Sequence, residues 1–271
     1  MNYINFIIFI ISFILSYIGS PMIFNMLIKA KVLGLNYLKE EIPICMGLLF
    51  IFVQTITISI ALIVTDFNRY NLISYLFAFV LIGLVGLLDD LIGDNHIKGF
   101  KGHIKSFFRG NLTTGGIKAG IGFFISLYIA IILSKSFMEV IVNTLIVALF
   151  TNLTNLFDLR PGRSIKVFLF ISIFMLFTSR VEGYNFLFYS FYGILTIYFP
   201  LDLKGKAMMG DVGSNVLGIT LGIYCGYTHS LIIKSIYLFL LIIIHIAAEK
   251  VSFSKIIENN RLLSFIDNIG R

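Results

Sequence analysis

Carboxylates gather at three points of the chain where long apolar runs end or begin. GLLDDLIGD carries Asp89 and Asp90, NLTNLFDLRPGR carries Asp158, and AMMGDVGSNVLG carries Asp211. Carboxylate oxygens suit hard cations such as Mg²⁺, which usually shares its coordination shell with substrate phosphates. Carboxylates, Mg²⁺ and basic side chains are the recurring parts of phosphoryl transfer. These aspartates therefore indicate phosphoryl chemistry, provided that the fold brings them together.

The second motif adds amides and guanidinium groups to its carboxylate. Asn152, Asn155 and Asp158 recur every third residue, which on a helix places them along one stripe. Polar groups at membrane depth are costly unless they face the protein interior or a watery cavity. Arg160 and Arg163 flank a Pro-Gly helix break, and their forked guanidinium groups can bind phosphate. The alternative is a helix end anchored at the membrane interface by polar residues.

The composition requires elements that lie in a membrane. Hydrophobic residues make up 58% of the 271 residues and charged residues 13%, with a mean hydropathy of +0.95. Soluble domains are about 45–50% apolar and about 25% charged. The strictly alternating segments of a membrane β-barrel are absent from the sequence. The expected fold is therefore all-α, a polytopic transmembrane helical bundle.

Nine apolar runs approach the roughly 20 residues that a spanning helix needs. We place these runs roughly at residues 4–28, 44–64, 71–88, 119–133, 139–157, 166–178, 186–200, 212–227 and 232–248. Alternating the connections between two sides puts seventeen of the 21 Lys and Arg residues on one side. The positive-inside rule makes that side cytoplasmic. The N-terminus is then outside, the C-terminus is cytoplasmic, and all the carboxylate motifs face the cytosol.

We expect one integral-membrane domain, with the spans and catalytic loops in residues 1–248. Residues 249–271 mix apolar and charged side chains and are too polar to span. An amphipathic segment on the cytoplasmic membrane surface fits this tail best. The net charge of +7 follows from the positive-inside bias, so nucleic acid is not an expected partner. Anionic phosphates or lipid headgroups are the expected partners of this charge.

The connection from residue 89 to residue 118 is unusually polar for this chain. Lys98, Lys101 and His103 follow the aspartate pair there and could bind a diphosphate or a lipid phosphate. Surface charge on the cytoplasmic side is the alternative explanation for each of them.

The motifs, taken in order, resemble a known enzyme family. An Asp-Asp pair ending an early helix, then N-x-x-N-x-x-D, then M-G-D-x-G-S is similar to the polyprenyl-phosphate N-acetylhexosamine-1-phosphate transferases. This family includes phospho-MurNAc-pentapeptide translocase. The resemblance covers roughly residues 1 to 248. It implies an enzyme that uses Mg²⁺, or Mn²⁺ in its place.

The resemblance also implies a reaction. A sugar-1-phosphate, of the N-acetylhexosamine type, passes from a UDP-sugar to polyprenyl phosphate. The products are polyprenyl-diphosphate-sugar and UMP, for cell-envelope glycan synthesis at the cytoplasmic face of the cell membrane. By this resemblance, Asp211 is the first metal ligand, and Asp158 lies near the nucleotide or the metal. Asp89 and Asp90 position or deprotonate the lipid phosphate.

The chain departs from the family at several positions. Met46 stands where the family's early P-x-x-G-G loop has its first glycine, and Leu159 follows Asp158 where relatives usually carry glycine. A late histidine motif is missing, with only His245 nearby. A second hypothesis is therefore a catalytically altered relative of the same fold, which binds lipid phosphate or has a regulatory role. A transporter is a third, although transporters bind near mid-bilayer. A homodimer is left open.

Overall fold

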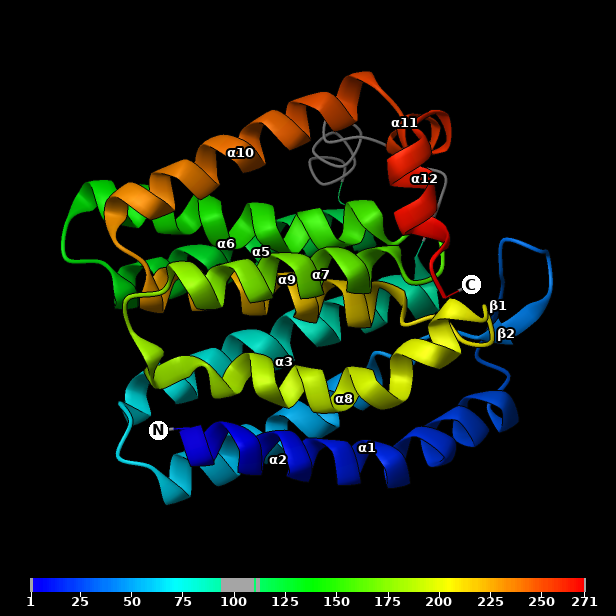
Figure 1. The fold of residues 1–271 in the computed structure, drawn as a ribbon, viewed down its shortest axis with the longest axis horizontal. Helices are drawn as coiled ribbons and strands as arrows, with labels where there is room; N and C mark the ends of the chain where they lie inside the picture. The colour runs from blue at the N-terminus through cyan, green and yellow to red at the C-terminus, as the bar shows by residue number, and fades with distance from the viewer. Residues whose placement is uncertain (1, 94–109, 111–112, 271) are drawn as a thin grey trace.

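The computed structural model describes residues 2–93, 110 and 113–270. Its long helices run side by side along one axis and reverse direction at each connection (Figure 1). Within the described residues, each of the nine expected ranges overlaps one long helix, and most of the helices extend a few residues beyond the range. These helices are α1 (Asn2–Lys29), α2 (Leu48–Val64), α3 (Arg69–Ile92), α5 (Thr114–Leu133), α6 (Phe137–Phe157), α7 (Arg163–Thr178), α8 (Phe186–Leu203), α9 (Gly210–Thr228) and α10 (Leu231–Lys250).

The apolar helices indicate a multi-pass membrane protein. Among the described residues, 6 helices are long and apolar enough to cross a membrane, namely α1, α3, α5, α6, α8 and α10. Of the other long helices, α2 has 17 residues and α7 has 16, while α9 has 19 residues interrupted by polar side chains and glycines. The prediction of a membrane helical bundle is confirmed at this level, and the count of nine spans stays a prediction.

The helix α9 lies at the centre of the bundle. Nearly all of its side chains are buried, and it packs against α3, α6 and α7. Two of its glycines face α6 directly. A Cβ atom at Gly218 would lie 2.3 Å from the carbonyl oxygen of Phe150, and one at Gly222 would lie 2.7 Å from Cα of Val147. Only glycine allows this close approach of the two backbones.

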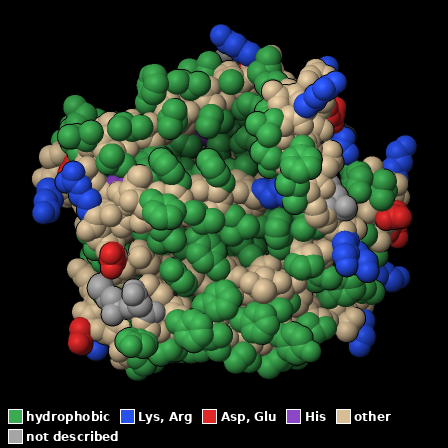
Figure 2. Space-filling view, in the orientation of Figure 1, with side chains coloured by type: hydrophobic (Ala, Val, Ile, Leu, Met, Phe, Trp, Pro, Cys, Tyr) green, Lys and Arg blue, Asp and Glu red, His purple; other side chains and the backbone are tan. Residues whose placement is uncertain are grey.

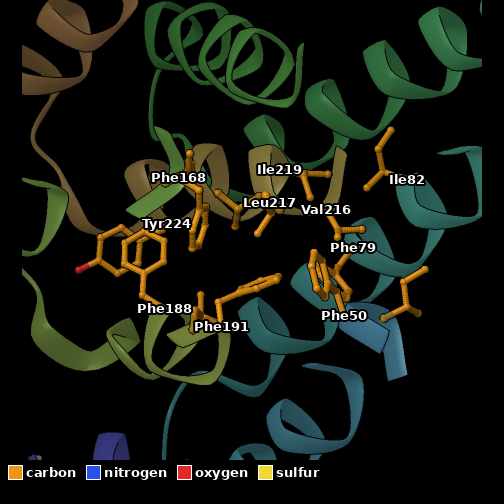
Figure 3. Close-up of a cluster of buried hydrophobic side chains, with 14 of the residues drawn as sticks. Phe50, Phe79, Ile82, Phe168, Phe188, Phe191, Val216, Leu217, Ile219 and Tyr224 are labelled. Carbon is orange, nitrogen blue, oxygen red and sulfur yellow. The ribbon is translucent and has the colours of Figure 1, made fainter. Parts of the chain in front are cut away.

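Aromatic side chains of the surrounding helices close the core around α9 (Figure 3). The rings of Phe50 and Phe191, from α2 and α8, meet edge to face with centroids 6.0 Å apart. Phe188 of α8 lies against Tyr224 of α9, with centroids 4.1 Å apart. These contacts fix the position of α9 and therefore of the motif at its N-terminus.

A short β-hairpin departs from the all-α expectation. Strands β1 (Leu33–Leu35) and β2 (Glu41–Pro43) pair antiparallel between α1 and α2. The hairpin is tied to the α8–α9 connection. The amide of Asn36 donates to the carbonyl of Gly205 at 3.1 Å, and Met208 N–H donates to the carbonyl of Pro43 at 2.9 Å. It therefore borders the end of the bundle where α3 finishes and α9 begins, which we call the carboxylate end.

The chain finishes in two short helices, α11 (Phe253–Asn259) and α12 (Arg261–Asn268). In Figure 1, where this tail is red, α12 runs across the ends of the long helices at the carboxylate end. The expected amphipathic tail is thus helical and packed on the bundle.

Candidate functional site

Asp90, near the end of α3, holds the first turn of α9. Its two carboxylate oxygens accept the N–H groups of Asp211 at 2.9 Å and Val212 at 3.1 Å, which have no partner within the helix. Gly210 precedes them with φ +69, and a Cβ atom there would lie 2.2 Å from a carboxylate oxygen of Asp90. Glycine is therefore required at this turn, and Asp90 acts as the cap of α9.

Asp89 and Asp211 share one lysine. The ammonium group of Lys118, in the first turns of α5, pairs with Asp211 and lies 3.7 Å from Oδ2 of Asp89. With its amide oriented to satisfy both neighbours, Asn155 accepts from Lys118 at 2.8 Å and donates to Oδ1 of Asp211 at 2.9 Å. These four half-buried side chains join α3, α5, α6 and α9 in one polar network.

A tight turn after α6 carries Asp158. The helix ends at Phe157, and α7 begins after Gly162, whose φ is +76. A Cβ atom at Gly162 would lie 2.5 Å from the side chain of Leu203. The N–H of Gly162 donates to Oδ2 of Asp202, on α8, at 2.6 Å. Glycine and this hydrogen bond therefore set the path of the turn beside α8.

The three motifs meet around one cavity of about 240 Å³ at the carboxylate end. The lining carboxylates are Asp90, Asp158, Asp202 and Asp211. Arg160 lines it as well, and the hairpin closes one side with Tyr37, Ile42 and Ile44. Elements far apart in sequence thus bring four acidic side chains to one hollow.

The carboxyl groups that line the cavity disfavour one another's ionisation. Burial raises the pKa of Asp158 well above its usual range, and the nearby carboxylates of Asp202, Asp211 and Asp90 raise it further, whereas Lys118 opposes them. Like charges that share a buried site disfavour ionisation of each member. A cation bound among them would remove that repulsion.

The oxygen donors of the cavity suit Mg²⁺ only if the phosphates of a bound substrate also coordinate the ion. Among the residues that the structure describes, no three His, Cys, Asp or Glu side chains are grouped so as to hold a metal ion by themselves. Mg²⁺ is usually bound through one or two carboxylates, substrate phosphates and water. Asp158 and Asp211 are the expected ligands, and Asp211 would exchange its contacts with Lys118 and Asn155 for the cation. Asp90 fits less well because backbone N–H groups already use both of its oxygens.

The two arginines of the second motif have different surroundings. Arg160 lines the cavity, with its guanidinium carbon 5.6 Å from the ring centroid of Tyr37 and one nitrogen 3.7 Å from Glu258. Arg163 is only 4% exposed and donates to both oxygens of Asp267 at 2.9 and 2.8 Å. The prediction that Arg163 is an open, phosphate-binding residue is therefore wrong. Arg163 instead forms a buried ion pair with the C-terminal tail.

The structure brings some further expected residues together and leaves others apart. Asn155 joins the Lys118 network, whereas Asn152 is exposed and does not line the cavity. The stripe ends at Asn155 because Asp158 lies just past the last helical residue. The remaining substrate-binding predictions, Lys98, Lys101 and His103, lie outside the described residues.

Sequence reasoning missed two residues at this end. In the sequence, Lys118 entered only the count of basic residues on the cytoplasmic side. Its position at the start of α5 places it beside the end of α3. Asp202 stands alone after Pro200, with no motif around it. A signal for both was their position at helix ends on the side where the other aspartates lie.

No protein-family model matches this chain, and a search of curated proteins also finds no match. The resemblance described above therefore rests on the residues of the three motifs.

Proposed function

We propose that the chain is a Mg²⁺-dependent phosphotransferase that moves a sugar-1-phosphate from a UDP-sugar to polyprenyl phosphate. One observation carries this proposal: four carboxylates from separate elements line one cavity beside Lys118 and Arg160, at one end of an apolar bundle. Acidic groups, basic groups and a divalent cation together suit a diphosphate. The apolar helices give a lipid acceptor a route to the same end.

The bonds exchanged in the proposed reaction are few. An oxygen of the lipid phosphate attacks the sugar-linked phosphorus of the UDP-sugar. A new P–O bond forms as the bond to UMP breaks, and the electron pair leaves on the UMP oxygen. No general base is needed, since a phosphate monoester carries a charge of about −1.5 to −2 at pH 7.

The residues of the cavity have separate roles in this proposal. Asp211 and Asp158 would hold Mg²⁺, and the bound cation would supply neutralisation of the diphosphate charge. Arg160 binds phosphate oxygens through its planar guanidinium group. Asp89, through its ion pair with Lys118, orients the ammonium group toward the incoming lipid phosphate. Asp90 is a positioning residue, because it holds the first turn of α9.

The proposed site faces the cytosol of a cell membrane. The support is the distribution of Lys and Arg, seventeen of 21 on the side of the carboxylate motifs, under the positive-inside rule. UDP-sugars are cytosolic, so this orientation gives the donor direct access.

A second candidate is a relative that binds lipid phosphate without turnover. It is favoured by the Lys118 ammonium group, which already neutralises Asp211 and lies beside Asp89. It is also favoured by Met46, fully buried where the family has glycine. A transporter has less support, since the carboxylates gather at one end of the bundle.

The test is UMP release by the purified chain in lipid nanodiscs with undecaprenyl phosphate, Mg²⁺ and a panel of UDP-sugars. We expect release with at least one UDP-amino sugar, loss with EDTA, and recovery with Mg²⁺ or Mn²⁺. The Asp158→Asn variant is the matched control for contaminating activity. If no sugar gives UMP while the lipid phosphate still binds, the second candidate replaces the first.

A further inference from the structure

The helix α12 packs on the protein with its polar face and leaves its apolar face open. Asp267 is buried at 8% exposure, whereas Leu262 and Phe265 are each 67% exposed. Ile266 and Ile269 are exposed as well. A surface helix of a soluble protein does the reverse and turns its apolar stripe to the core.

Strong polar contacts hold α12 in this orientation. Arg163 forms the two buried hydrogen bonds to Asp267 and also donates to Ser254 of α11 at 3.0 Å. Lys166 donates to the carbonyls of Ile266 and Asp267 at 2.9 and 2.7 Å. Removing one partner of a buried ion pair is strongly destabilising. The helix therefore cannot roll over to hide its apolar side chains.

Lipid is the partner whose chemistry matches this face. The tail follows directly from α10, whose exposed Phe239, Ile243 and Ile246 belong to a helix apolar enough to span a membrane. Figure 2 shows hydrophobic side chains over most of this face of the molecule, with many Lys and Arg side chains at the end where the tail lies. Lys255 and Arg261, both exposed, lie on the tail itself. Apolar residues flanked by basic ones are typical of interfacial helices on anionic membranes.

We propose that α11 and α12 form an interfacial anchor. The apolar face of α12 lies at the headgroup–acyl boundary of an anionic leaflet, and the Arg163–Asp267 pair ties it to the turn that carries Asp158 and Arg160. The anchor sets the height of that turn relative to the membrane surface. It does not depend on the proposed phosphotransferase activity.

The first test measures the depth of α12 in nanodiscs that contain phosphatidylglycerol. An environment-sensitive fluorophore is attached at Phe265→Cys or, as the matched control, at Asn259→Cys on the exposed polar side of α11. The unsubstituted chain, whose two cysteines are buried, reports background labelling. We expect nitroxide-labelled lipid to quench the fluorophore at position 265 several-fold more than the one at position 259. The quenching at position 265 should be weaker in nanodiscs of phosphatidylcholine alone. Quenching of position 265 by aqueous iodide, equal to that of position 259, would overturn the anchor.

The second test addresses the tie to the turn. Asp267→Asn keeps the size of the side chain but removes the charge that faces Arg163. We expect chymotrypsin to cut the tail about tenfold faster in this variant, and an Arg163→Asp, Asp267→Arg double variant to regain resistance. Equal cleavage of the Asp267→Asn variant and the unsubstituted chain would refute the tie. Neither test measures turnover, so failure of the anchor is distinguishable from failure of the proposed activity.

Discussion

Both ends of the bundle are polar, but they satisfy their polar groups in different ways. At the end opposite the carboxylates, His229 contacts the hydroxyls of Thr178 at 3.0 Å and Thr228 at 2.8 Å. Thr178 also meets the hydroxyl of Tyr237 at 2.9 Å. Burial lowers the pKa of His229 to about 4, so this imidazole is neutral at physiological pH. The hydrogen bonds of this network therefore join neutral groups, with the buried Lys234 nearby.

The carboxylate end gathers charged groups around a cavity, and two of them, Asp90 and Asp202, also accept backbone N–H groups. Neutral hydrogen bonds finish the opposite end of the same helices at low cost. Four carboxylates around a cavity of about 240 Å³ instead repel one another. Polar residues at helix ends are therefore a poor sign of function by themselves. Several carboxyl groups that converge on one cavity from separate elements are a better one.

Removing one charge at the carboxylate end should have the largest effect. Asp211→Asn should lower Mg²⁺-dependent UMP release at least a thousandfold, about 4 kcal/mol of barrier. The fold should remain, because Asp90 and not the side chain of Asp211 bonds the first N–H groups of α9. Asp66→Asn, an exposed carboxylate at the opposite end, is the matched control and should keep full turnover. Turnover above a tenth of the unsubstituted rate would remove Asp211 from the proposed metal ligands.

Substitutions of the adjacent residues Asp89 and Asp90 should lower the stability of the fold by different amounts. Asp90→Ala leaves two N–H groups of α9 without acceptors, and hydrogen bonds to charged groups contribute about 1.5–3 kcal/mol each. We expect a loss of about 3 kcal/mol of unfolding free energy. Asp89→Ala should cost much less, since its contact with Lys118 is 3.7 Å long and partly exposed. A thiol-reactive dye can follow thermal unfolding, because both cysteines are buried. Equal midpoints for the two variants would contradict the capping role.

Arg160 should affect substrate binding more than stability. Its contact with Glu258 is 3.7 Å long, with 38% and 59% of the two side chains exposed, and such pairs contribute little. Arg160→Ala should therefore raise KM for the UDP-sugar about tenfold and leave the thermal midpoint nearly unchanged. Steady-state kinetics at several donor concentrations separate KM from kcat. An unchanged KM would make Arg160 a surface anchor only.

Substitution of His229, at the end opposite the carboxylates, should have the smallest effect on stability, and only at acidic pH. The pKa of His229 is lower in the folded chain, about 4, than the usual value of about 6.5. Its contribution to stability is therefore full above pH 6.5 and is lost as the pH falls toward 4. His229→Gln, which can keep hydrogen bonds to both threonines, should flatten this part of the pH profile. Circular dichroism melts between pH 4 and pH 8 measure it, and identical profiles would show that His229 does not titrate in this way.

The sequence predicts the long helices well, because their signal is local. An apolar run of about 20 residues in a membrane forms a helix that satisfies its own backbone. The hairpin of residues 33–43 could not be predicted from its composition. It depends on the hydrogen bonds that Asn36 and Met208 make across more than 160 residues of sequence.

Only part of the candidate site could be predicted, for a similar reason. The motif aspartates stand out as charges at the ends of apolar runs. Asp202 does not, because its importance comes from the turn at Gly162 that packs against α8. The placement of Arg163 also escaped prediction, because its partner, Asp267, lies 104 residues further on. Long-range ion pairs leave no periodic trace in a single sequence.

The central position of α9 has a consequence for the order in which the protein is made. Helices α3 and α6 leave the ribosome before α9, yet both pack against it. Until α9 is synthesised, Thr154 lacks the carbonyl of Ser214, to which its hydroxyl donates at 2.7 Å, and the backbone of α6 at Phe150 lacks its neighbour Gly218. The nascent bundle must therefore stay open along one side until α9 enters. Its final assembly is late, and an insertion factor or chaperone that shields this side during translation would have its greatest effect at that stage.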